Sequence, residues 1–182
     1  MSEAQEYKTR AENDAPYATG AMAALSRHAS QACLWLSGLG LIAITIIILW
    51  QVFARYVLNA SPSWSEQSAL YILVWTVLLA AAAGVREGFH IRITALQDAL
   101  SRPLRKSAMI AAHLVTGAIG VYLIVYGATL VAALWAYDIP TLGVPRGSAF
   151  LPIPLAGALI VFFSAEHILA LLRNQRVSPQ WR

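Results

Sequence analysis

The chain has 182 residues, of which 58% are hydrophobic and only 12% are charged, with a formal net charge of +4. Soluble domains carry roughly twice that share of charged residues, so the composition excludes an ordinary soluble domain and an intrinsically disordered chain. The one cysteine, Cys33, excludes a disulfide scaffold within the chain, and the basic residues gather beside long apolar runs, which indicates a membrane rather than nucleic acid.

The first element is a polar segment, residues 1–28, which we expect to be an N-terminal tail. It carries Glu3, Glu6, Glu12 and Asp14 before the first apolar run begins. Acidic residues in these positions, and the length of the run that follows, do not fit a secretory signal peptide.

Four long runs without Asp, Glu, Lys or Arg follow this tail. About 20 apolar residues in a helix cross a hydrocarbon core of roughly 30 Å, and all four runs reach or approach that length. The sequence therefore predicts an all-α integral membrane protein with a four-helix membrane domain over residues 29–172. The expected transmembrane spans are residues 32–55, 64–86, 107–136 and 150–171.

The second span is expected to begin with a capping box. Ser63 and Glu66 have the spacing at which the serine oxygen accepts from the third helical amide and the Glu66 carboxylate reaches back to the Ser63 amide. Capping accounts for Glu66 without any further role. The alternative is that Glu66 is the carboxylate of a small proton-coupled exporter, but such a residue should lie deep and face a cavity.

Between the second and third spans, residues 88–102 are typical of an amphipathic helix lying in the membrane interface. Apolar residues recur there at helical spacing, polar residues occupy the other face, and Pro103 follows. Before the fourth span, Pro152 and Pro154 are expected to delay or kink the helix. Residues 173–182 form the expected C-terminal tail.

The distribution of Lys and Arg predicts the orientation. Eleven basic residues lie in the two tails and in the segment between spans two and three, whereas only Arg55 and Arg146 lie on the opposite side. Positively charged segments of membrane proteins stay in the cytoplasm, so both termini are expected to be cytoplasmic.

Ionisable side chains inside membrane spans are usually functional, and this chain offers few of them. His113 and His167 are expected at similar depth on two helices. Two interpretations remain open: hydrogen bonding near the headgroups, or ligation of a haem in the membrane anchor of a respiratory complex. The sequence has no P-loop, HExxH or GxSxG motif, so we expect no enzyme.

Small residues in the third span predict close helix packing. Gly120 and Gly127 are seven residues apart, which places them on one helix face where another helix can approach. Trp75 is expected deeper than the aromatic belt of the membrane, and its indole N–H therefore needs a partner inside the chain or on a second subunit.

The segments FARYVLNASPSWSEQSALYILVW, VREGFHIRI, TLGVP and LPIPLAG carry a family resemblance. With them the chain resembles the small membrane subunit of tripartite ATP-independent periplasmic (TRAP) transporters, the DctQ-like family, over about residues 32–172. Gln67 stands where many members have a second acid, and Ile93 and Thr94 stand where many have an aspartate. Roles of those acids cannot be carried over to this chain.

The resemblance implies a non-catalytic subunit of a bacterial inner-membrane transporter for an organic acid, such as a C4-dicarboxylate or a sugar acid. A periplasmic binding protein delivers the substrate, and a large membrane subunit moves it and holds the sodium sites. We therefore expect this chain to act as a scaffold among membrane lipids, with no cofactor of its own and no nucleic-acid partner. Candidates for the partner interface are Arg55, Trp64, Glu66, Trp75, Arg86, His90, Gly120, Gly127 and Arg146.

Overall fold

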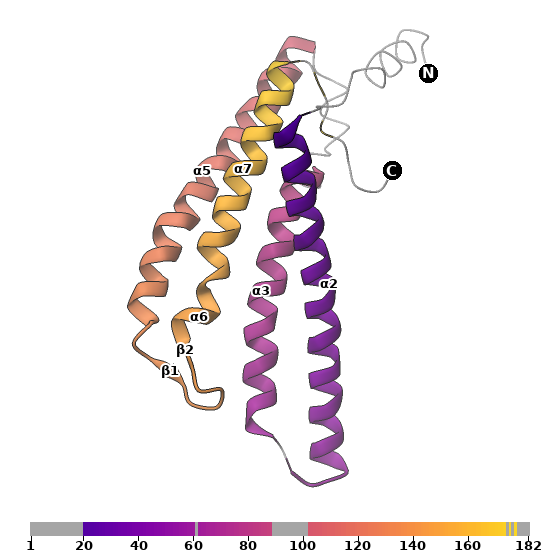
Figure 1. The fold of residues 1–182 in the computed structure, drawn as a ribbon, viewed down its shortest axis with the longest axis vertical. Coiled ribbons are helices and arrows are strands. Elements are labelled where there is room, and N and C mark those ends of the chain that lie inside the picture. The colour runs from indigo at the N-terminus through magenta and orange to yellow at the C-terminus, as the bar shows by residue number, and fades with distance from the viewer. Residues whose placement is uncertain (1–19, 61, 89–101, 174, 176, 178–182) are drawn as a thin grey trace.

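The computed structural model describes residues 20–60, 62–88, 102–173, 175 and 177. Within them, four long helices form nearly all of the structure (Figure 1). All four are long and apolar enough to cross a membrane, the last when counted from Arg146, which confirms the predicted helical membrane architecture. The long helices are α2 (Ala21–Tyr56), α3 (Ser63–Glu87), α5 (Arg102–Leu134) and α7 (Pro152–Leu172).

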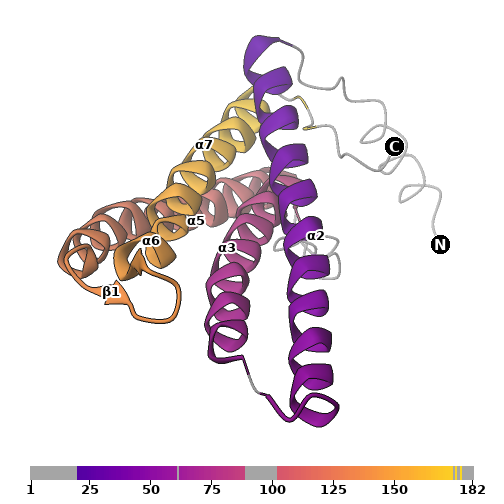
Figure 2. The same ribbon diagram turned by 60° about the horizontal axis from the view of Figure 1, so that its bottom comes forward.

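The helices are arranged as two pairs. α2 packs along α3, α5 packs along α7, and α3 contacts α7 to join the pairs. We call the end at which α2 begins and α7 ends the proximal end, and the end with the α2–α3 connection the distal end. The pairs lie close together at the proximal end and diverge toward the distal end, as Figures 1 and 2 show from two directions.

At the distal end, a short hairpin connects α5 to the fourth span. Strand β1 (Asp138–Ile139) pairs antiparallel with β2 (Val144–Pro145), with Ile139 opposite Val144. Gly143 has φ +65°, a left-handed conformation that suits the turn between the strands. The hairpin leads into the short helix α6 (Arg146–Phe150), which packs against α5.

Small side chains at the α3–α7 contact build the core. Ala82 and Ala156 have no exposed surface, and this lets the two helices approach closely around Phe163, which is also fully buried. A second cluster joins α2 to α3 through Cys33 and Leu79. By contrast, most large apolar side chains of α2 and α5 are exposed, as expected for helices that face lipid.

The first helix is longer than the span expected from hydrophobicity. α2 begins at Ala21, so residues 21–28 are helical although they were expected in the tail. The segment is rich in alanine, a strong helix former, and its one serine, Ser26, is buried and accepts a hydrogen bond from Arg86 on α3. A single exposed arginine, Arg27, ended the uncharged run used for the prediction, but it does not end the helix.

The predicted capping box at the start of α3 is wrong. Pro62 occupies the N-cap position with extended backbone angles, and no side chain caps the helix. Ser63 is therefore already the first helical residue, one position too late to cap. Ser65 instead donates to the Pro62 carbonyl at 2.8 Å, and Glu66 is exposed.

The prolines delay the fourth long helix as expected. α6 ends at Phe150 and α7 begins with Pro152 in its first position, where the missing N–H costs nothing. The expected interfacial helix at 88–102 lies almost entirely outside the described residues, although Gly88 ends α3 in a left-handed conformation. Most of the two expected tails also lies outside them.

Candidate functional site

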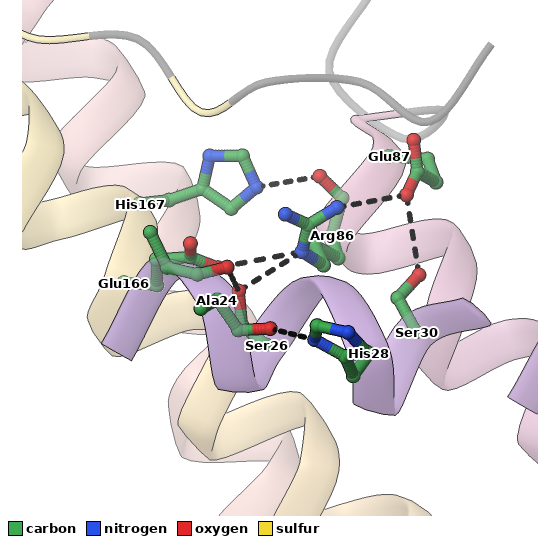
Figure 3. Close-up of polar contacts among 9 residues, drawn as sticks. Ala24, Ser26, His28, Ser30, Arg86, Glu87, Glu166 and His167 are labelled. Carbon is green, nitrogen blue, oxygen red and sulfur yellow. Dashed lines mark hydrogen bonds and ion pairs between the residues drawn. The ribbon is translucent and has the colours of Figure 1, made fainter. Parts of the chain in front are cut away.

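Buried and half-buried polar side chains from all four long helices gather near the proximal end, and Figure 3 shows those of α2, α3 and α7. Each helix places them on the face turned toward its neighbours. On α3 and α7 they lie within about two turns of the proximal terminus, and on α2 and α5 they extend somewhat deeper. Polar groups buried in a membrane bundle are costly and need partners from the same protein. We call this set the polar cluster; its members are Ser26, Ser30, Arg86, Glu87, His113, Glu166 and His167.

Arg86, near the end of α3, is the centre of the polar cluster. Its side chain has no exposed surface. The guanidinium donates from Nε to the Ser26 hydroxyl at 3.0 Å and from Nη1 to Glu87 Oε1 at 3.1 Å, and Nε lies 3.6 Å from Glu166 Oε2. One guanidinium therefore connects α2, α3 and α7 at a single point, as Figure 3 shows.

Glu87 is held from two sides, and Glu166 is held by its ion pair with Arg86. Glu87 Oε1 accepts a second hydrogen bond, 3.1 Å long, from the Ser30 hydroxyl on α2. Glu166 on α7 has a side chain only 4% exposed and takes part in an ion pair with Arg86. Because an unpaired charge in this environment would be strongly destabilising, these contacts indicate that the polar cluster holds the helices in one arrangement.

The two histidines link α7 to α3 and α5. His167 donates from Nε2 to the backbone carbonyl of Arg86 at 2.8 Å, and its ring stacks on that of His113 with centroids 4.5 Å apart and planes 9° apart. His113 is 4% exposed, and its Nδ1 has no hydrogen-bond partner within the described part of the chain. The sequence predicted the two side chains at similar depth, and in the structure their rings are in direct contact.

This stacking does not fit the haem alternative. A histidine nitrogen binds iron through a lone pair in the plane of its ring, so two axial ligands stand on opposite sides of the metal. The rings of His113 and His167 lie face to face instead, and Nε2 of His167 is engaged by a carbonyl.

We therefore expect purified protein to show no Soret absorption band when it is produced in haem-replete cells. The His113→Phe variant should keep the ring stack and have the same visible spectrum as the wild type. A Soret band that disappears in His113→Phe would contradict the interpretation that His113 only packs on His167, and would restore the haem interpretation.

The exposed members of the predicted interface lie toward the distal end. Arg55 ends α2, Trp64 and Glu66 begin α3, and Arg146 begins α6; all four are exposed, Trp64 by 43%. Their exposure leaves them available to another protein. His90 lies outside the described residues.

The other predicted interface residues are packed inside the chain. Arg86 belongs to the polar cluster rather than to the surface. Gly120 and Gly127 face α7: a Cβ at Gly120 would lie 2.9 Å from the Gly157 carbonyl oxygen, and one at Gly127 2.9 Å from Pro154 Cδ. Trp75 packs on the α2–α3 cluster, and its buried Nε1 has no hydrogen-bond partner among the described residues.

Sequence reasoning missed Ser26, Ser30, Glu87 and Glu166 as site residues. The adjacent opposite charges of Arg86 and Glu87 at the end of an apolar run were the available signal, since a neighbouring pair can enter the membrane edge more easily than one charge. The two serines carried no signal of their own, because their role depends on the packing of α2 against α3.

Comparisons with known proteins give a consistent result. The family model described as "Tripartite ATP-independent periplasmic transporters, DctQ component" matches residues 44–174. The chain is 26% identical over 132 residues to the sialic acid TRAP transporter small permease protein SiaQ of Vibrio cholerae serotype O1, covering 72% of this chain and 76% of that protein.

Two further relatives are C4-dicarboxylate TRAP transporter small permease proteins named DctQ. The one from Vibrio cholerae serotype O1 is 31% identical over 64 residues, covering 35% of this chain and 28% of that protein. The one from Rhodobacter capsulatus is 30% identical over 105 residues, covering 54% of this chain and 44% of that protein. The aligned part thus covers less than half the length of either DctQ protein.

Proposed function

Because the chain belongs to the DctQ family of TRAP transporter components, we propose that it is the non-transporting small membrane subunit of such a transporter. In this role it supports a large membrane subunit that carries out sodium-coupled uptake of an organic acid delivered by a periplasmic binding protein. The sodium sites belong to the large subunit, and this chain needs no cofactor.

The polar cluster is the observation that carries the scaffold role. Arg86, Glu87 and Glu166 are ionisable groups at the ends of membrane helices, where such residues often serve transport. Here they bond to one another and to Ser26 and Ser30, with side chains between 0% and 4% exposed for the charged groups. Groups engaged in this way are suited to fixing helices rather than to binding a passing solute.

The proposed orientation follows from charge. The proximal end is the cytoplasmic one, since eleven of the thirteen Lys and Arg residues lie within residues 8–27, 86–106 and 173–182 of the sequence, on the side of the membrane assigned to both termini. The distal end then faces the periplasm, where Arg55, Glu66 and Arg146 are available for polar contacts with the binding protein. Such contacts tune the rate and specificity of docking more than its strength. The membrane is the bacterial inner membrane.

The proposed substrate is a carboxylate-bearing organic acid. The relatives are named for sialic acid and for C4-dicarboxylates, and both are acids of this kind. Selectivity within that class is assigned to the other two proteins, because this chain keeps its own buried charges engaged with each other.

The test is reconstitution in proteoliposomes under an inward sodium gradient. We expect uptake of radiolabelled sialic acid or C4-dicarboxylate only when this chain, its large subunit and the binding protein are combined. The chain alone should give no uptake. Transport by the chain alone, or full transport without it, would overturn the proposed function.

A further inference from the structure

Two tyrosines lie side by side on the face of α5 that is turned away from α7. Tyr122 and Tyr126 are 59% and 58% exposed, and their rings lie 4.2 Å apart at 33°. Gly120 marks the side of α5 that packs on α7. At about 100° per residue, Tyr122 points about 200° away from Gly120 around the helix. The exposed side chains of Val115 and Ile119 continue this face toward the proximal end.

The depth of Tyr122 is unusual for an exposed tyrosine. It lies midway between Lys106 and Asp138 in the longest uncharged run of the chain, about 24 Å along the helix from Lys106. With a hydrocarbon core of roughly 30 Å, its ring is inside the apolar layer. Tyrosines facing lipid prefer the interface, where the exposed Tyr56 and Tyr137 lie at the distal end.

Neither hydroxyl has a hydrogen-bond partner within the part of the chain that the structure describes. The neighbouring Thr129 satisfies its own hydroxyl by donating to the Tyr126 carbonyl at 2.8 Å. Tyrosine cannot do the same, because its hydroxyl lies far from its own backbone. Lipid tails offer no acceptor, so a phenol left in them loses the hydrogen bond it would make in water.

We propose that the face of α5 formed by Tyr122 and Tyr126 is the docking surface for a transmembrane helix of the large subunit, one that offers hydrogen-bond acceptors to the two hydroxyls. This inference rests on the proposed function. The depth excludes a water-soluble partner such as the binding protein, and the absence of charge from residues 107 to 137 fits a partner inside the bilayer. Polar side chains bonded across helices are a common means of association in membranes.

The first test removes the hydroxyls and keeps the rings. The double variant Tyr122→Phe, Tyr126→Phe should co-purify with the co-expressed large subunit with about eightfold lower affinity, and each single variant with about threefold lower affinity. Tyr56→Phe, which removes an exposed hydroxyl at the end of α2, is the matched control and should bind like the wild type. Unchanged binding by the double variant would overturn the proposal.

The second test identifies the neighbour. A benzophenone amino acid is placed at position 122 in the test variant. In a separate comparison variant it is placed at position 46, where Ile46 is a 61% exposed residue of α2. Irradiation of the membrane complex should give an adduct with the large subunit from position 122. An adduct with a second copy of this chain, or no protein adduct from that position, would overturn the proposal.

Different results would contradict the proposed function and the docking surface. If the wild-type chain does not co-purify with the large subunit at all, the proposed function fails and the docking surface fails with it. If the wild type co-purifies but the tyrosine variants bind equally well and position 122 gives no adduct, the subunit assignment stands and only the docking surface is wrong.

Discussion

Replacing Arg86 with methionine is expected to destabilise the isolated chain by about 3–5 kcal/mol. Methionine fills much of the same volume but removes the guanidinium that contacts Glu87, Glu166 and Ser26 together. Two carboxylates would then remain buried without that compensation. The measurement is the free energy of unfolding in mild detergent, followed by circular dichroism as sodium dodecyl sulfate is added.

Two comparison variants distinguish the loss of the buried Arg86 charge from the general effect of replacing an arginine. Arg55→Met changes an exposed arginine in the last turn of α2 and should shift stability by no more than about 0.5 kcal/mol. The triple variant Arg86→Met, Glu87→Gln, Glu166→Gln removes all three charges and should recover much of the loss, because no uncompensated carboxylate remains. If Arg86→Met is as stable as Arg55→Met, the polar cluster does not hold the helices together.

The number and order of the helices were predictable from the sequence because the bilayer imposes them. A helix must cross a layer of fixed thickness and carry few charges while it does so, and both conditions are visible in a single chain. The start of α2 was not predictable in this way. Residues 21–28 are helical because they are rich in alanine and place Ser26 against Arg86, and the exposed Arg27 hid this from a count of uncharged residues.

The polar cluster was less predictable than the helices because its contacts are long-range. Arg86 was expected in an interface, since a charge at the end of an apolar run is normally exposed. Its partners Ser26 and His167 stand 60 and 81 positions away in the sequence. A single amino-acid sequence read by itself gives no sign of such pairs. Only His113 and His167 could be paired from the sequence, because their expected depths in the membrane agreed.

Substituting Gly120 with alanine is expected to destabilise the chain by about 1–3 kcal/mol relative to Gly117→Ala. The new Cβ of Gly120→Ala would lie 2.8 Å from Val161 Cγ2 and 2.9 Å from the Gly157 carbonyl oxygen, so α7 must move away. At Gly117 the nearest atom would be Ser164 Cβ at 3.7 Å, an ordinary contact. Both changes raise helix propensity equally, so their difference isolates the packing.

The same pair of variants decides between an internal and an external role for this glycine. Sequence alone placed Gly120 at a partner interface, whereas the structure places it against α7. An internal contact predicts that Gly120→Ala lowers the stability of the chain purified without any partner, in the same detergent titration. If the isolated Gly120→Ala and Gly117→Ala chains are equally stable and only Gly120→Ala loses the large subunit, the close approach at Gly120 belongs to the partner and not to α7.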